Sequence, residues 1–160
     1  MEVITLVGKQ NSGKSTTLKE LIMQICLPQS VIDIQSAYNF HSYIRKAYVQ
    51  QSSLKACVDK YQDVSIAFTH NNKTIGITTL GDDVNKVANI ANAMNGCDVF
   101  ICASHPNHKL RMALEKQKVS FTNIEKVYAV KCESYVFNSK LAQCRTNVRQ
   151  QTVNEIINLI

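Results

Sequence analysis

The sequence predicts an α/β protein built as a three-layer sandwich, with helices on both faces of a mainly parallel sheet. Two observations predict this class: apolar runs typical of strands alternate with longer segments of helical period, and two of the runs are joined by a short turn. The chain has 160 residues, of which 45% are hydrophobic and 19% charged. We therefore expect a single folded domain over 1–160, with enough apolar side chains for a proper core.

The first predicted elements are a buried strand over 3–7 and a helix that opens near residue 16. Apolar residues recur along this helix at the spacing of one helical face, at Leu18, Leu21, Ile22 and Ile25. Pro28 ends the segment, and a short apolar run predicts a strand over 31–34. Residues 39–55 carry apolar side chains at helical spacing, so we expect a second helix there.

Two strands over 63–69 and 74–80 form a predicted β-hairpin. Apolar and polar residues alternate along the first of them, as in a half-exposed strand. Residues 70–73 read His-Asn-Asn-Lys, a composition typical of a turn. Because this connection is so short, the hairpin contributes one antiparallel strand to the sheet.

The rest of the chain alternates between helix and strand. Either Asp82 or Asp83 suits the N-cap of the next helix, and Pro106 suits the first turn of the one after it. The predicted elements are a helix over 84–93, a strand over 98–103, a helix over 107–117, a strand over 124–130 and a helix over 139–159.

A glycine loop joins the first strand to the first helix. Residues 8–15 read GKQNSGKS and fit the Walker A pattern G-x-x-x-x-G-K-[ST], whose backbone N–H groups surround a phosphate. The lysine of this pattern reaches the β- and γ-phosphates, and its final hydroxyl binds Mg²⁺. We expect nucleotide contacts from Gly8, Asn11, Ser12, Gly13, Lys14, Ser15 and Thr16, with Lys14 also catalytic and Ser15 a metal ligand.

This strand, loop and helix resemble the P-loop NTPase superfamily, and in particular its kinase and GTPase branch. The resemblance covers the whole chain as architecture but only residues 8–15 as a specific motif. It implies a P-loop fold and a nucleoside triphosphate bound together with Mg²⁺.

The segment Gly81-Asp82-Asp83 is the candidate for the second half of the site. In P-loop proteins an aspartate directly closes the apolar strand, whereas here Thr78 has that place and the acids follow Gly81. The segment also resembles the D-x-x-G switch of GTPases. We expect its strand to lie beside the phosphate loop, with Gly81 facing the γ-phosphate and Asp82 or Asp83 as the catalytic acid, Asp82 holding Mg²⁺. The alternative is that both acids are only helix caps.

Ser104 is the second candidate, because it follows the strand over 98–103 and its hydroxyl could sense the γ-phosphate or position a substrate. His105 and His108 are three residues apart but have no third ligand, which makes a metal site the weaker interpretation and solvated loop histidines the simpler one.

Arginines that could neutralise transferred charge are Arg111, Arg145 and Arg149, the last two four residues apart on one helical face. The alternative is a solvated surface. No [NT]-K-x-D loop follows any predicted strand, which favours ATP over GTP.

Charge and cysteines bear on partners and compartment. The net charge is +6, but the 18 Lys and Arg residues are spread along the chain, so a nucleic-acid partner is not expected. No apolar run approaches the length of a membrane span, and the first residues do not resemble a signal peptide. Six cysteines without C-x-x-C spacing indicate reduced thiols and a cytoplasmic protein.

Three functions fit these features. The first is Mg-dependent binding and hydrolysis of ATP, coupled to a conformational change or to a protein partner. The second is a small kinase that transfers the γ-phosphate to a nucleotide or other small metabolite. The third is a nucleotide-binding module without turnover, since the expected Walker B aspartate is absent.

Overall fold

The computed structural model is an α/β fold around one six-stranded sheet. It describes residues 1–37, 53–107, 109–129 and 138–160, and the side chains of the last segment from residue 143 onward. The strands are β1 (Glu2–Val7), β2 (Val31–Ser36), β3 (Val64–His70), β4 (Lys73–Thr78), β5 (Val99–Ser104) and β6 (Ile124–Tyr128). The helices are α1 (Lys14–Ile25), the 3₁₀ turn η1 (Pro28–Ser30), α2 (Leu54–Lys60), α3 (Val84–Ala93), α4 (Leu110–Lys116) and α5 (Asn138–Ile157).

The sheet is mixed, with strand order β2-β3-β4-β5-β1-β6. β1 pairs in parallel with β5 and β6, and β4 pairs in parallel with β5. β3 is antiparallel to both of its neighbours, β2 and β4. The predicted mainly parallel sheet with an antiparallel hairpin strand is therefore confirmed. β4 is not paired with the strand that precedes the glycine loop, because β5 separates β4 from β1.

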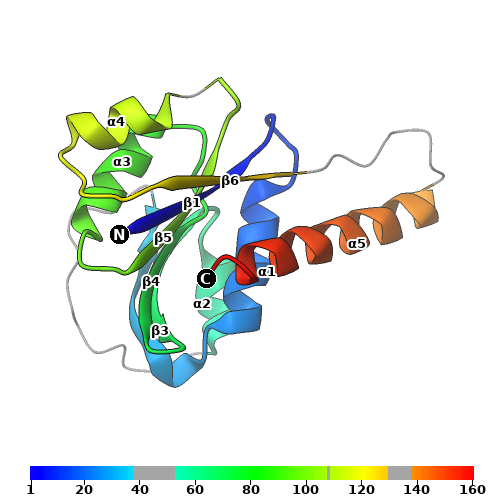
Figure 1. Cartoon of the computed structure of the whole chain (residues 1–160). Helices are drawn as coiled ribbons and strands as arrows, with labels where there is room; N and C mark the ends of the chain where they lie inside the picture. Colours follow the sequence, from blue (N-terminus) through cyan, green and yellow to red (C-terminus); the bar gives the residue numbers. More distant parts are fainter. Residues whose placement is uncertain (38–52, 108, 130–137) are drawn as a thin grey trace.

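Helices cover both faces of this sheet, α1, α2 and α5 on one side and α3 and α4 on the other (Figure 1). Each strand sends alternate side chains into the two layers. In β1, Ile4 and Leu6 join the core beneath α1, whereas Val3 joins the core beneath α3 and α4. All four apolar residues predicted for the inner face of α1 are buried at 5% exposure or less: Leu18, Leu21, Ile22 and Ile25.

Most of the segment predicted as a helix over 39–55 lies outside the described residues, and α2 follows at Leu54–Lys60. The Ser53 side chain caps α2 by accepting a hydrogen bond from the N–H of Ala56 at 3.2 Å. α4 begins at Leu110 rather than near residue 107, after a turn in which His105 Nδ1 accepts from the N–H of Asn107 at 3.3 Å.

Five of the six cysteines lie in the described part of the chain, and all five are free thiols. Burial raises the pKa of Cys26 to about 11 and that of Cys102 to about 12. Metal binding and nucleophilic attack need the thiolate, so burial makes these two side chains unreactive. Among the helices of the described segments, none has the length and apolar character needed to cross a membrane.

Candidate functional site

The glycine loop connects β1, which ends at Val7, to α1, which begins at Lys14. Gly13 has φ 83° and Asn11 has φ 60°, so both residues adopt the left-handed conformation that glycine and asparagine tolerate best. Gly8 has no room for a side chain, since a Cβ there would collide with Ser12 Oγ and lie 3.0 Å from Ala129 Cβ. The backbone conformation thus favours glycine at position 13, and the neighbouring side chains favour it at position 8.

Lys14 is folded back over this loop and is only 7% exposed. Its Nζ donates hydrogen bonds to the carbonyl oxygens of Gly8 at 2.9 Å and Lys9 at 2.8 Å. Burial lowers the pKa of Lys14, and the nearby charge of Asp82 acts in the opposite direction. The ammonium is therefore fixed in place by its own loop, in a setting where an added negative charge would favour its protonated form.

Ser15 contacts a carboxylate that the sequence analysis did not select. Its Oγ donates to Asp63 Oδ1 at 3.0 Å and lies 3.1 Å from the carbonyl oxygen of Thr79. Asp63 is only 7% exposed, and its Oδ1 also accepts from Thr79 Oγ1 at 2.8 Å. The same Thr79 hydroxyl accepts from the N–H of Val64 at 2.9 Å. These bonds join the first turn of α1 to the start of β3.

The predicted hairpin carried the signal for Asp63. Because β3 runs antiparallel to β4, β3 begins at the sheet edge where β4 ends, and Ser65 pairs with Thr78. An acid that precedes β3 therefore reaches the edge at which the parallel strands finish. Asp63 does not fit the pattern of an acid that follows an apolar strand, because it precedes β3.

A cavity of ≈ 400 Å³ opens between the glycine loop and the two ends of the hairpin. It brings together most of the predicted phosphate and metal contacts with two residues that precede β3. Its lining comprises Gln10, Asn11, Ser12, Gly13, Lys14, Ser15, Thr16, Gln62, Asp63, Gly81 and Asp82.

The turn after β4 separates the two acids predicted there. Asp82 is exposed and lines the cavity, whereas Asp83 does not line it. Asp83 instead caps α3, its Oδ1 accepting from the N–H groups of Asn85 at 3.1 Å and Lys86 at 3.0 Å. The cap interpretation thus fits Asp83, and Asp82 is the acid that faces the glycine loop.

Gly81 is buried against β5. A Cβ on this residue would lie 2.6 Å from Ala103 Cβ and 3.0 Å from the Ala103 carbonyl carbon. Only glycine allows the turn to approach β5 so closely, and this approach holds Asp82 at the cavity.

Ser104 lies close to the loop, but its side chain points to the opposite face of the sheet. Its carbonyl oxygen accepts from the N–H of Gly8 at 3.1 Å, whereas its Oγ accepts from Thr5 Oγ1 at 2.9 Å. Ser104 does not line the cavity beside Lys14; it lines a second cleft under α4, together with His105. His108 lies outside the described residues.

Two of the candidate arginines approach the glycine loop from α5. Arg145 and Arg149 line a cavity of ≈ 290 Å³ that also borders Asn11, Thr16 and Ala129. Arg149 Nε lies 2.9 Å from Glu20 Oε1, so its charge is balanced. Arg111 is on the other side of the sheet, where it lies 3.8 Å from Glu115 and 5.3 Å from the ring of Phe121.

In the cavity between the glycine loop and the hairpin, the side chains that could bind a metal offer oxygen atoms, which are the ligands that Mg²⁺ takes. Across the described residues, no group of three or more His, Cys, Asp or Glu side chains could hold a metal by itself. Mg²⁺ commonly binds through one or two carboxylates together with substrate phosphates and waters. The Ser15 hydroxyl and the Asp63 carboxylate fit that incomplete protein shell.

Comparisons of this chain with protein-family models, curated proteins and solved structures give no match.

Proposed function

We propose that this chain is a P-loop NTPase that binds a magnesium–nucleoside triphosphate at residues 8–15 and hydrolyses it. ATP is the favoured nucleotide, because the guanine-reading sequence of GTPases is absent. The observation that carries the proposal is the bond from Ser15 to the buried carboxylate of Asp63. It puts a hard anionic oxygen beside the hydroxyl that the motif assigns to the metal.

The charges of the cavity support a metal–nucleotide complex rather than a free nucleotide. Asp63 and Asp82 both line the cavity, and each would repel a triphosphate. A divalent cation between the phosphates and Asp63 removes that repulsion. When bound, Mg²⁺ would neutralise charge on the transferred phosphoryl group. Ser15 and Asp63 would hold it.

The glycine loop supplies the phosphate contacts. Its backbone N–H groups and the N-terminus of α1 provide donors and a partial positive charge. The Lys14 ammonium has three N–H donors, of which two are directed to Gly8 and Lys9. The third is free to meet a phosphate oxygen.

Hydrolysis needs a group that orients water at the open side of the cavity. Gln62 and Asp82 are the exposed polar side chains beside Asp63 and Gly81. A carboxamide or carboxylate there can accept a hydrogen bond from the attacking water.

The bonds around Asp63 also suggest how turnover is coupled to a conformational change. When Ser15 becomes a metal ligand, its bonds to Asp63 and to the Thr79 carbonyl must rearrange. The Thr79 side chain bonds to Asp63 and to the N–H of Val64, at the start of β3. Loss of the γ-phosphate would therefore be transmitted to the two ends of the hairpin.

The first test measures ATP affinity by calorimetry. Lys14→Ala removes a charge-assisted contact of about 1.5–3 kcal/mol, so affinity should fall roughly ten- to a hundred-fold. Lys9→Ala is the matched control, because Lys9 is exposed in the same loop but does not line the cavity. Ser15→Ala should weaken ATP binding in the presence of magnesium and leave it unchanged in the absence of magnesium. Equal affinity of Lys14→Ala and wild type would contradict the proposal.

A phosphate-release assay then distinguishes the three activities. Steady release from ATP without an acceptor supports hydrolysis. Consumption of ATP only when a nucleotide or metabolite acceptor is added would make the protein a kinase. Binding without either reaction would leave a nucleotide-binding module and contradict hydrolysis.

A further inference from the structure

A second cleft, of ≈ 700 Å³, lies between α4 and the carboxyl ends of β1, β5 and β6. It is on the opposite face of the sheet from α1, the face on which α3 and α4 lie (Figure 1). In β6, Ile124 packs against the core beneath these helices, whereas Lys126 and Tyr128 are exposed. The sheet therefore has an uncovered surface beside the glycine loop, where ligands of α/β proteins commonly bind.

The floor of this cleft is polar and ordered. Thr5 and Ser104 are 1% and 5% exposed, and their hydroxyls share a hydrogen bond of 2.9 Å. They occupy neighbouring strands and face the same side of the sheet, so a bond between two buried hydroxyl groups holds the base of the cleft.

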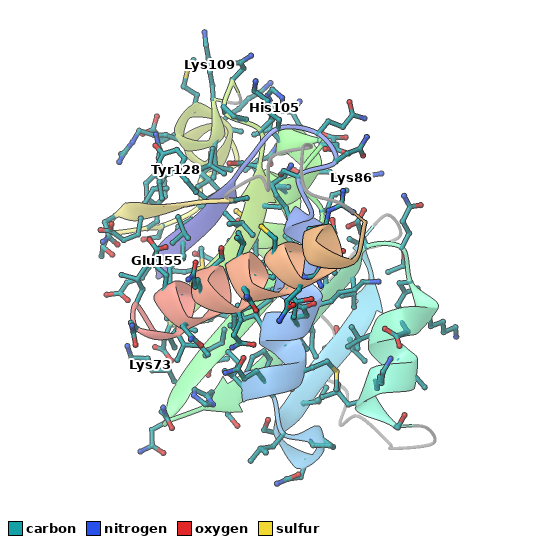
Figure 2. All side chains as sticks on the ribbon, turned by 90° about the vertical axis from the view of Figure 1, so that its right-hand side faces the viewer. Lys73, Lys86, His105, Lys109, Tyr128 and Glu155 are labelled. Atoms are coloured by element: carbon teal, nitrogen blue, oxygen red, sulfur yellow. The ribbon has the colours of Figure 1, made fainter. Side chains whose placement is uncertain are left out.

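Every ionisable side chain of the lining is basic or neutral. Lys109, Arg111 and Lys126 line the cleft together with His105 and Tyr128, and no carboxylate lines it. Among the described residues, neither Lys109 nor Lys126 forms an ion pair, whereas Arg111 is near Glu115. Figure 2 shows Lys109 and His105 at one end of the molecule, with Tyr128 nearby on β6. Two lysine charges are thus available to an anion.

The walls of the cleft are partly apolar. Met112 and Tyr128 are 59% and 61% exposed, which leaves a thioether and an aromatic ring in solvent beside the lysines. Leu110 and Ile124 lie deeper in the same lining. Flexible methionine and aromatic side chains suit contact with an apolar ring.

We propose that this cleft is a second ligand site that binds a small organic anion. Lys109 and Lys126 hold its phosphate or carboxylate, and its apolar ring packs against Tyr128 and Met112. This site is separate from the phosphate loop, because none of its lining residues lines the cavity around Lys14. It does not depend on nucleotide binding or hydrolysis.

The test is a titration of the ¹⁵N-labelled protein with phenyl phosphate, phenylacetate and benzyl alcohol, followed by NMR. The first two probes carry the two possible anionic groups, and the third carries the ring alone. We expect saturable shifts at β6 and the end of β5 with one or both anions, and much weaker ones with benzyl alcohol. Shifts at residues 8–16 that Lys14→Ala abolishes would report a separate event at the phosphate loop.

Matched variants assign the effect to the cleft. Each lysine is exposed, so Lys109→Gln or Lys126→Gln alone should raise the dissociation constant of the anionic probe only about fivefold. The double variant with both substitutions should raise it about tenfold or more. Lys116→Gln, on the outer surface of α4, should change it less than twofold. Unaltered melting temperatures would show that the variants fold. Equal affinity in the double variant and the Lys116 control, or shifts confined to the phosphate loop, would overturn the proposal.

Discussion

The two ends of the hairpin bring carboxylates to the same cavity by different means. At the start of β3, Asp63 is buried and accepts hydrogen bonds from Ser15 and Thr79. After β4, Asp82 is exposed and acts on Lys14 through its charge. A buried, hydrogen-bonded carboxylate has a fixed position, whereas an exposed one is screened by water and mobile. Asp63 is therefore suited to hold a metal and Asp82 to adjust the charge around it.

Replacement of Asp63 should have the largest effect of any change in this comparison. If the proposed function holds, Asp63→Asn should lower the rate of ATP hydrolysis at least about a hundredfold, or about 2.7 kcal/mol, because the proposed anionic metal ligand is lost. The asparagine retains an oxygen that accepts from Ser15 and Thr79, so the melting temperature should change little. Phosphate release at saturating ATP and magnesium measures this effect.

Asp59→Asn is the control for Asp63→Asn. Asp59 is an exposed acid on α2, paired with Lys55, and does not line the cavity. Wild-type turnover in both variants would mean that Asp63 has only a structural role, and the comparison would then favour Asp82.

Gly81→Ala should destabilise the fold rather than alter a charge. The new Cβ would meet the side chain and the backbone of Ala103, so we expect a loss of about 1–3 kcal/mol. For a domain of this size, each kcal/mol lowers the melting temperature by roughly 2–4 °C. Calorimetry measures the shift. An unchanged melting temperature would show that the turn can move away from β5.

Asp82→Asn should change the pH dependence of nucleotide binding. Phosphates favour the charged form of Lys14, so affinity falls as the pH rises through the pKa of Lys14 in the free protein. Burial already lowers that pKa, and Asp82 partly opposes the effect. Removing the Asp82 charge lowers the pKa further, so affinity should begin to fall at a lower pH. Calorimetric titrations across the alkaline range measure the displacement, and coincident profiles would exclude this role of Asp82.

Asp83→Ala should have the smallest effect. Loss of the α3 cap costs about 1 kcal/mol of stability, while Asp83→Asn keeps an equally good cap and costs at most a few tenths. Neither change should alter phosphate release by more than about twofold, because Asp83 does not line the cavity. A large loss of turnover in Asp83→Asn with normal stability would return Asp83 to the catalytic candidates.

Local pattern predicted much of the fold. The strand β3, the turn after it and the apolar face of α1 depend on neighbouring residues, and each appears in the structure. The half-exposed character predicted for β3 is wrong, because residues 64–68 are all buried and helices cover both faces of the sheet there. The order of strands depends instead on how crossovers pack, which is why the position of β5 between β1 and β4 was not foreseen.

The part of the candidate site that lies within the glycine loop could be predicted from the sequence, because one short motif contains all of its residues. The conformations of Asn11 and Gly13 and the position of Lys14 follow from the motif itself. Whether Asp82 or Asp83 faces the cavity depends on a single turn of backbone, which the sequence does not determine. The face to which Ser104 points depends on the register of β5 against β1.

The bonds of Lys14 to its own loop have a consequence for the entropy of phosphate binding. A free lysine side chain loses up to about 2 kcal/mol of rotational freedom when a ligand immobilises it. In this protein that freedom is already lost on folding, since Nζ is tied to the Gly8 and Lys9 carbonyls. An arriving phosphate therefore meets an ammonium that is already in place, and binding does not have to immobilise this side chain again. Arginine at this position would present a planar fork of donors instead of a compact ammonium with three donors, so the exchange would not be conservative.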